Sequence, residues 1–161
     1  MKILIVSDTH GNEENLKTVI EKEKPFDLFL HAGDVCGGEE RIAGMVPAEI
    51  HMVRGNCDYA CNLKMEDVFR TENLKFLLLH GHPFLGGGDV LNLFYAGKAK
   101  GCDAVVFGHT HQPLIVKEDG VILMNPGSLS RPRQAGYAPS YIVADVENGV
   151  IEPKIHFLKK K

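Results

Sequence analysis

Short apolar runs alternate with amphipathic stretches through the first third of the chain. Runs of strand length lie at residues 2–6, 27–31 and 49–53. Residues 12–24 repeat apolar side chains at helical spacing, with Asn12 as a suitable N-cap and Pro25 just beyond the end. A shorter helix is predicted over residues 39–45. Strands that alternate with helices are typical of a largely parallel sheet, which we expect here.

The rest of the chain favours antiparallel hairpins. Pairs of apolar runs flank short polar turns, at residues 66–71 with 74–79, 114–116 with 121–124, and 141–146 with 150–157. Two of the turns, Asp119-Gly120 and Asn148-Gly149, have dipeptides whose preferred turn matches the twist of antiparallel strands. The first two hairpins are separated by a predicted helix and a predicted strand, at residues 89–100 and 104–107. The glycine run at 86–88 lacks the strand of a nucleotide-binding fingerprint, and we interpret it as a turn and, as a hypothesis, a mobile flap.

A parallel-rich half joined to an antiparallel half predicts an α/β fold. A four-layer sandwich accommodates both halves, with two mixed β-sheets packed face to face and flanked by α-helices. The chain has 161 residues, of which 44% are hydrophobic and 24% are charged. This length and balance are typical of one folded domain, which we expect to span residues 1–161.

Net charge and cysteine usage exclude several classes of protein. The 18 basic and 21 acidic residues give a net charge of −3, which argues against nucleic acid as a partner because such proteins need a basic face. The first apolar run is much shorter than a signal peptide or a membrane span requires. No pair among the four cysteines has CxxC spacing, so we expect no disulfide framework. We therefore expect a reduced, cytoplasmic protein without a membrane anchor.

Polar side chains follow five of the apolar runs, at the point where each predicted strand ends. They are Asp8, His10, Asp34, Asn56, His80, His109 and His111. Taken singly, each pair or single residue is typical of an ordinary turn. Because ligand crevices in open α/β sheets lie beyond the carboxyl ends of the strands, we expect these side chains to lie together.

A cluster of two carboxylates, one amide and four imidazoles is costly to bury without partners, and metal ions are the simplest partners. Mixed imidazole and carboxylate ligands suit borderline divalent ions such as Mn, Fe, Co, Ni or Zn. The lack of cysteine among them argues against a closed structural zinc site. Seven ligands exceed the need of one tetrahedral ion, whereas a carboxylate that bridges two ions accounts for them all. Two divalent ions less two carboxylates leave a charge of about +2, which suits a phosphate ester.

At these positions the chain resembles the calcineurin-like metallophosphoesterases. The motifs are Asp8-Thr9-His10, Gly33-Asp34, Gly55-Asn56, His80-Gly81-His82, Gly108-His109-Thr110-His111 and Asn125-Pro126-Gly127-Ser128. The short chain and the form Gly55-Asn56-Cys57-Asp58 look most like the small single-domain phosphodiesterases of bacteria and archaea. The fold implied by the resemblance is a pair of mixed sheets flanked by helices, which agrees with the pattern of apolar runs.

The resemblance also implies a ligand set and a mechanism. Its two ligand sets are Asp8, His10, Asp34 and His111 for one ion, and Asp34, Asn56, His80 and His109 for the other. Asp34 would bridge the ions, and Asp34, Asn56 and His80 would form the catalytic centre. A hydroxide shared by the two ions would attack phosphorus, while both ions neutralise charge on the phosphoryl oxygens. The expected activity is that of a metal-dependent phosphodiesterase, a phosphoric ester hydrolase, acting on a small phosphate ester.

Residues beside the ligands are candidates for substrate binding. Arg54 precedes the Gly-Asn pair and its guanidinium suits a phosphate oxygen, although a surface salt bridge explains it equally well. Cys57 stands where many members of the family have a histidine that acts as general acid or phosphate contact. Since a thiol is a weak donor, esters with acidic leaving groups should suffer least from this change. Arg131 and Arg133 follow Gly127-Ser128 and are candidates to reach the substrate, but we interpret them first as residues of a solvated loop.

The alternative function belongs to a different class. A related retromer subunit keeps the family fold as a scaffold after losing part of the catalytic set. A scaffold predicts a damaged metal shell or an exposed apolar surface, whereas all seven ligand types are present here. A nuclease is disfavoured by the acidic net charge, and a protein phosphatase by the lack of an arginine after Gly33-Asp34. The sequence leaves the oligomeric state open, a homo-oligomer included.

Overall fold

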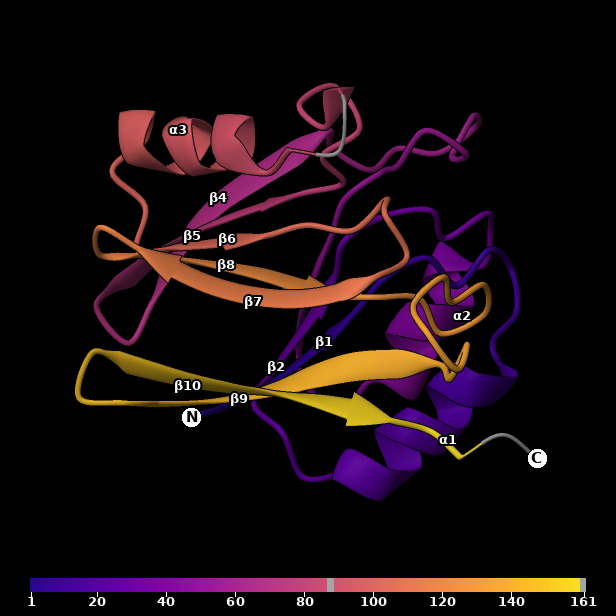
Figure 1. The fold of residues 1–161 in the computed structure, drawn as a ribbon. Coiled ribbons are helices and arrows are strands. Elements are labelled where there is room, and N and C mark those ends of the chain that lie inside the picture. Colours follow the sequence, from indigo (N-terminus) through magenta and orange to yellow (C-terminus); the bar gives the residue numbers. More distant parts are fainter. Residues whose placement is uncertain (87–88, 160–161) are drawn as a thin grey trace.

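Two mixed five-stranded sheets form the centre of the molecule, described by a computed structural model for residues 1–86 and 89–159 (Figure 1). The strands are β1 (Lys2–Val6), β2 (Leu28–His31), β3 (Glu49–Met52), β4 (Glu66–Thr71), β5 (Leu74–Leu79), β6 (Ala104–Val106), β7 (Pro113–Glu118), β8 (Val121–Pro126), β9 (Ser140–Glu147) and β10 (Val150–Phe157). The first sheet has the order β10-β9-β1-β2-β3 and the second β4-β5-β6-β8-β7. Each sheet joins three parallel strands to antiparallel partners.

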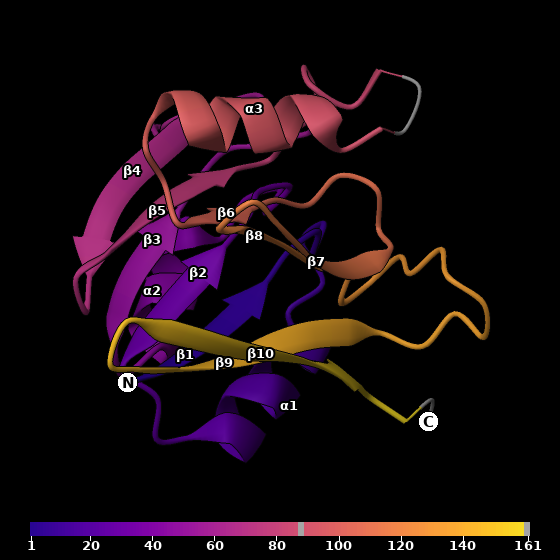
Figure 2. The same ribbon diagram turned by 60° about the vertical axis from the view of Figure 1, so that its left-hand side comes forward.

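Helices cover the outer face of each sheet. α1 (Glu14–Glu23) and α2 (Glu39–Met45) lie against the first sheet, and α3 (Leu91–Ala99) lies against the second (Figures 1 and 2). One apolar cluster fills the space between the sheets, and two others fill the spaces between each sheet and its helices. The predicted four-layer sandwich is confirmed. None of the helices in the described part of the chain has the length and apolar character needed to cross a membrane.

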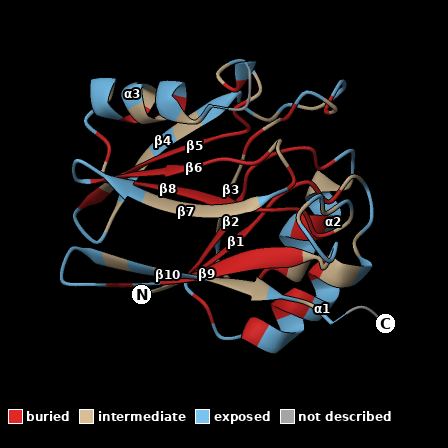
Figure 3. Ribbon diagram, viewed as in Figure 1, coloured by how far each residue is buried: buried red, intermediate tan, exposed pale blue. Residues whose placement is uncertain are grey.

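The burial pattern of each strand follows from its place in the sandwich (Figure 3). β1 and β2 are buried along almost their whole length, because the other sheet covers one of their faces and helices cover the other. Such strands carry continuous apolar runs rather than an alternation. β4 alternates between exposed and half-buried residues, as expected for an edge strand with one face towards solvent.

All three predicted hairpins form, with β4-β5, β7-β8 and β9-β10 as their strand pairs. The two central residues of each turn have positive φ angles, which the expected hairpin turn requires. The last hairpin returns to the first sheet, where β9 pairs antiparallel with β1. The two sheets are therefore both mixed, although the apolar pattern placed the parallel strands mainly in the first half of the chain.

Two helices begin later than predicted. α1 begins at Glu14, and the Asn12 side chain accepts a hydrogen bond of 3.2 Å from the Glu14 N–H. α3 begins at Leu91, and Asp89 accepts a hydrogen bond of 2.9 Å from the Leu91 N–H. In both cases a polar side chain closes a turn just before the helix instead of capping it directly. The flap hypothesis rests on residues 87 and 88, which lie outside the described residues.

A buried polar contact joins α1 to β9. The Tyr141 hydroxyl donates a hydrogen bond of 2.6 Å to Glu23 Oε1, and Lys2 Nζ lies 3.2 Å from Glu23 Oε2. Tyr141 is fully buried and Glu23 is only 9% exposed. Burial acts to raise the pKa of Glu23, but the hydrogen bonds from Tyr141 and Lys2 outweigh it, so the pKa lies below its ordinary value. The ionised carboxylate therefore stabilises the fold.

We expect Tyr141→Phe to lower the free energy of unfolding at neutral pH by about 1.5–3 kcal/mol, because it removes a hydrogen bond to a buried charged group. The depressed pKa of Glu23 makes this stabilisation present above the pKa of the unfolded chain, and lost as the pH falls through the folded value. In urea unfolding between about pH 5 and pH 3, wild type should therefore lose more stability than Tyr141→Phe. Tyr95→Phe, at a tyrosine that is 57% exposed, is the matched control. Equal pH dependence of wild type and Tyr141→Phe would contradict the prediction.

Candidate metal centre

The loops that follow β1, β2, β3, β5 and β6 carry the polar residues predicted from the sequence. Within the first sheet, the Asp8 N–H donates a hydrogen bond of 3.0 Å to the Gly33 carbonyl. Within the second, the Gly108 N–H donates one of 3.1 Å to the His80 carbonyl. Because these loops leave the carboxyl ends of neighbouring parallel strands, their side chains meet at one end of the sandwich.

Five of the seven predicted ligands have a backbone in the left-handed region. Their φ angles are 53° at Asp8, 46° at His10, 54° at Asp34, 68° at His109 and 58° at His111. Holding a residue other than glycine in this region costs on the order of 1 kcal/mol or more of folding free energy. Backbone strain of this kind is concentrated at functional sites. The loops therefore hold these side chains in directions that relaxed turns would not give.

One group of side-chain atoms surrounds Asp8 Oδ1. His111 Nε2 lies 3.0 Å from this oxygen and His10 Nε2 lies 3.7 Å from it. His10 Nε2 also lies 3.7 Å from Asp34 Oδ2. One ligand atom from each of the four residues falls within 4.8 Å of the others. These four residues are the set that the family resemblance implies for one ion.

A second group shares Asp34 Oδ2 with the first. His80 Nε2 lies 3.4 Å from Asp34 Oδ2 and 2.9 Å from Asn56 Oδ1. His109 Nδ1 lies 3.0 Å from the same Asn56 oxygen. The structure thus brings all seven predicted ligands together, in two groups with the Asp34 carboxylate between them.

Each carboxylate is anchored through one oxygen and presents the other to the cluster. Asp8 Oδ2 accepts hydrogen bonds from the Ser7 hydroxyl at 2.6 Å and from the His109 N–H at 3.2 Å. Asp34 Oδ1 accepts one of 2.8 Å from the Cys57 N–H. The oxygens that face the imidazoles are Asp8 Oδ1 and Asp34 Oδ2. The anchoring hydrogen bonds therefore determine which oxygen of each carboxylate is available to bind a metal ion.

Backbone carbonyls orient two of the imidazoles. His80 Nδ1 lies 2.8 Å from the Ala32 carbonyl and His111 Nδ1 lies 2.7 Å from the Arg131 carbonyl. Since a carbonyl only accepts, Nδ1 carries a proton in both rings, and Nε2 is the nitrogen that faces the cluster and would offer its lone pair to a metal ion. Metal-binding histidines are held in this way in proteins.

The two carboxylates are ionised at neutral pH. Burial acts to raise the pKa of Asp8, but its contacts with His10 and His111 hold the pKa well below the usual range. Burial acts in the same direction on Asp34, yet the hydrogen bond with His80 and the charge of that ring lower its pKa to about 2. Two buried negative charges in one cluster need a positive partner.

The donor set fits divalent metal ions. Asp8 Oδ1 is buried and receives no hydrogen bond from any described residue, although His111 Nε2 is close to it. An ionised oxygen in such a position is costly unless a cation lies beside it. Imidazole nitrogens, carboxylate oxygens and one amide oxygen suit the borderline transition metals. The geometry therefore supports metal binding at the residues that the sequence predicts.

Asp58 fixes the loop after β3 against the loop after β2. Its carboxylate accepts hydrogen bonds of 2.7 Å from the Gly55 N–H and 2.7 Å from the Cys36 N–H. Both donors stand beside predicted ligands, so Asp58 positions Asn56 and Asp34. In the sequence, its place two residues after Asn56 is a weak signal that is also typical of a turn.

Asn125 and Ser128 support the ligands from β8 and the segment after it. Asn125 Nδ2 donates a hydrogen bond of 3.0 Å to the Gly108 carbonyl. The Ser128 hydroxyl donates one of 2.7 Å to the Asp8 carbonyl. Both side chains are fully buried, and they hold the backbone on either side of the cluster. Their role is not readable from residue type alone, and the Asn-Pro-Gly-Ser motif is the only signal for it.

The candidate substrate residues stand beside the cluster. Arg54 Nε lies 2.9 Å from Met65 Sδ, and Cys57 holds Asp34 through its backbone N–H. Burial and the charge of Asp34 raise the pKa of the Cys57 thiol, so it is protonated at neutral pH. The side chains of Arg131 and Arg133 are exposed as expected. Their backbone, however, is bonded to His111, through the Arg131 carbonyl at 2.7 Å and the Arg133 N–H at 3.0 Å.

Two glycines let the backbone approach the carboxylates. A Cβ on Gly55 would clash with Asp34 Oδ1 and lie 2.6 Å from the Asp34 backbone nitrogen. A Cβ on Gly108 would clash with Ser7 Oγ and lie 2.7 Å from Asp8 Oδ2. Both glycines leave room for the buried carboxylates, which no larger residue would provide.

Comparison with known proteins identifies relatives over most of the chain. A family model for the calcineurin-like phosphoesterase superfamily domain matches residues 1–149. A probable metallophosphoesterase of Bacillus subtilis is 36% identical over 149 residues, which are 92% of this chain and 86% of that protein. A probable metallophosphoesterase of Methanocaldococcus jannaschii is 35% identical over 136 residues, 83% of this chain and 70% of that protein.

Solved structures share the fold. A predicted phosphoesterase of Streptococcus pneumoniae superimposes with a TM-score of 0.85 at 23% identity, covering 97% of this chain and 88% of that chain. A protein described as a novel archaeal phosphodiesterase gives 0.78 at 25% identity, over 98% and 100% of the two chains. Vps29 of Entamoeba histolytica, in complex with zinc, gives 0.78 at 22% identity, over 98% and 99%.

We expect Gly55→Ala to weaken the binding of Mn²⁺ by about 10–100-fold, the loss typical of disturbing a group that orients a metal ligand. The added methyl group would displace Asp34, whereas Gly44→Ala places a methyl group in open space on α2 and should bind Mn²⁺ as wild type does. Isothermal titration of chelator-treated protein measures both affinities. Wild-type affinity in a folded Gly55→Ala protein would contradict the assignment of Asp34.

Proposed function

The chain belongs to the calcineurin-like phosphoesterase superfamily, and from that premise we propose that it is a metal-dependent phosphodiesterase that hydrolyses a small phosphate ester. The observation that carries the proposal is the position of Asp34 Oδ2, which lies 3.7 Å from His10 Nε2 and 3.4 Å from His80 Nε2. One carboxylate oxygen therefore belongs to both groups of ligand atoms. Such sharing is typical of two-metal hydrolases.

The two groups would hold two divalent ions. Asp8, His10, Asp34 and His111 would hold one, and Asp34, Asn56, His80 and His109 the other, with Mn, Ni, Co, Fe or Zn as the candidate metals. Bound there, the ions supply Lewis acidity for the activation of water and for the charge on the phosphoryl oxygens. The anchored carboxylates and carbonyl-bound imidazoles keep the ligand atoms in place, so the site needs little rearrangement to receive an ion.

The reaction adds water across one ester bond of the phosphodiester. A bond forms between phosphorus and the water oxygen, the bond to the leaving oxygen breaks, and that oxygen takes up a proton. Cys57 and Arg54 are the candidate contacts for the substrate. Because a thiol is a poor donor, the leaving oxygen of an acidic alcohol, such as an aryl alcohol, needs less help than that of an alkyl alcohol. We therefore expect aryl esters to react faster than alkyl esters.

One observation supports a diesterase, and a second narrows the range of its substrates. The solved relative described as an archaeal phosphodiesterase is similar over 98% of this chain. The acidic balance of the chain, −3 overall, disfavours long nucleic acids as substrates.

A reducing compartment such as the cytoplasm suits a chain whose four cysteines show no paired spacing.

A protein-binding scaffold is the competing function, since the same fold occurs in Vps29. That likeness lies below 25% identity and bears on the fold alone. A scaffold has no need of seven ligands with anchored carboxylates and oriented imidazoles. The intact ligand set therefore favours an enzyme over a scaffold.

We expect chelator-stripped protein to hydrolyse bis(p-nitrophenyl) phosphate only after a transition metal is restored. Asp34→Asn and His80→Ala should each lower kcat by at least about a hundredfold, the loss typical of removing a group that stabilises charge in the transition state. Asp145→Asn, at an exposed aspartate of β9, is the matched control and should retain wild-type turnover. Release of p-nitrophenolate measures the rate.

Two results would contradict the proposed activity. Protein that binds metal stoichiometrically but turns over neither diester nor monoester with Mn, Ni, Co, Fe or Zn is not a phosphoesterase, and the scaffold becomes the better account. Turnover that survives Asp34→Asn would place the reaction outside the proposed centre.

A further inference from the structure

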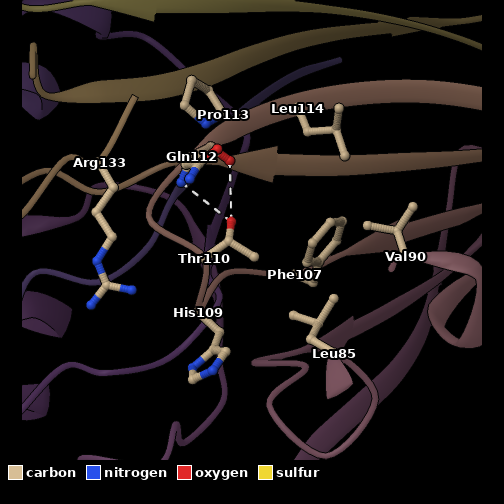
Figure 4. Close-up of a pocket in the computed structure, with 9 residues that line it drawn as sticks. All are labelled: Leu85, Val90, Phe107, His109, Thr110, Gln112, Pro113, Leu114 and Arg133. Carbon is tan, nitrogen blue, oxygen red and sulfur yellow. Dashed lines mark hydrogen bonds between the residues drawn. The ribbon is translucent and has the colours of Figure 1, made fainter. Parts of the chain in front are cut away.

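A pocket opens beside the candidate metal centre, and of the seven proposed ligands His109 alone lines it. It has a volume of about 430 Å³, which is within the size range of small-molecule sites. We call it the lateral pocket, and define it by Leu85, Val90 and Leu114 at one end and His109 and Arg133 at the other (Figure 4). Since His109 belongs to the proposed ligand set, a group held in the lateral pocket would adjoin a phosphate at the metals.

The apolar end of the lateral pocket is built from the core. Leu85 and the fully buried Phe107 belong to the apolar cluster between the second sheet and α3. Val90 and Leu114 are partly buried and pack against that cluster. A surface supported in this way is preformed, so an apolar ligand can bind there without first ordering side chains. Burial of apolar area on these residues would then contribute directly to affinity.

The other end of the lateral pocket is cationic. Arg133 lies on the far side of Thr110 and His109 from Leu85 and Val90 (Figure 4). Within residues 1–86 and 89–159, its guanidinium has no hydrogen bond or ion pair, and no acidic side chain is among the described residues that line the pocket. The donors of Arg133 are therefore available to a phosphate oxygen.

We propose that the lateral pocket binds an apolar, ring-sized ester group of the substrate, while Arg133 faces the phosphate. The inference rests on the proposed function and deepens it, because it names the substrate class as phosphodiesters with an aryl or similar apolar substituent. A nucleobase fits the apolar end less well, since its polar edge would meet Leu85, Val90 and Leu114 there, which offer no hydrogen bonds. The polar side chains that line the pocket, Thr110 and Gln112, lie between that end and Arg133 (Figure 4). The apolar end of the pocket would thus contact the ring, and Arg133 at the other end would contact the phosphate.

Diesters with a common leaving group test the proposal. Methyl p-nitrophenyl phosphate, phenyl p-nitrophenyl phosphate and the p-nitrophenyl ester of thymidine 5′-phosphate all release p-nitrophenolate, so differences in kcat/KM report mainly on the group that is retained. We expect the phenyl ester to exceed the methyl ester by about tenfold or more, as partial burial of a ring predicts. We expect it to exceed the thymidine ester as well.

Variants of the apolar end should change this preference. Val90→Ser removes apolar surface at the residue that precedes α3, where serine is a favourable helix cap. It should lower the phenyl-to-methyl ratio by about threefold or more, and Val90→Ser with Leu114→Thr should lower it further. Val68→Ser makes the same change on β4, at a valine that is 39% exposed, and should leave the ratio unchanged. Arg133→Met should raise KM for the diesters more than it lowers kcat, whereas Arg70→Met, at an exposed arginine of β4, should not.

A binding measurement keeps this inference separate from the proposed activity. In ¹H–¹⁵N spectra, diphenyl phosphate should shift the backbone signals of Val90 and Leu114 at concentrations where dimethyl phosphate does not. If no ester is turned over with any metal, the proposed function fails, and these spectra alone decide whether the pocket takes an apolar phosphate ester. Equal kcat/KM for methyl and phenyl esters, a thymidine ester that is the best substrate, or spectra unchanged by diphenyl phosphate would each overturn the inference.

Discussion

Asp34 is held through one carboxylate oxygen, and the direction of its other oxygen decides how the two halves of the site meet. The Cys57 N–H fixes Oδ1 at 2.8 Å, so Oδ2 is left between His10 and His80 at 3.7 Å and 3.4 Å. His10 comes from the first sheet and His80 from the second. A single anchored carboxylate thus joins the ligands of both sheets, and the packing of the sandwich fixes the distance between them.

The surrounding structure serves to keep two buried negative charges in place. Asp58 binds the loops after β2 and β3 together, and Ser128 holds the Asp8 carbonyl. Glycine at positions 55 and 108 makes room for the carboxylates. Charges buried in this way reduce the stability of a protein unless a cation accompanies them. The two buried carboxylates therefore lower the stability of the fold if they only have a structural role, and they lower it less if they bind metal ions.

The sequence was sufficient for the sandwich and for the gathering of the candidate ligand residues at one end of it, for one physical reason. Apolar runs that end in Asp, Asn or His mark strands, and parallel strands bring their carboxyl ends to one edge, so Asp8, Asp34 and His80 could be placed together without coordinates. Hairpin turns such as Asn148-Gly149 have local chemistry that specifies their form. The last hairpin joins the first sheet because β9 pairs with β1. This pairing is between segments far apart in the sequence, so no local pattern predicts it.

Other features depended on contacts between distant segments. From the sequence, Asp58 is either a turn residue or a support for the site, and its hydrogen bonds from the N–H groups of Gly55 and Cys36 give it the supporting role. For Arg133 the sequence left both a solvated loop and a substrate contact open, and the residue lines the lateral pocket together with Leu85 and Leu114, which only the fold brings near it.

Anomalous diffraction from crystals of the protein soaked in Mn²⁺ would show whether Asp34 joins two ions. We expect two manganese peaks about 3.5–4 Å apart, both within bonding distance of Asp34 and each beside one of the two ligand groups. A single peak at Asp8, His10, Asp34 and His111, with none at Asn56, His80 and His109, would contradict a centre in which Asp34 joins two ions.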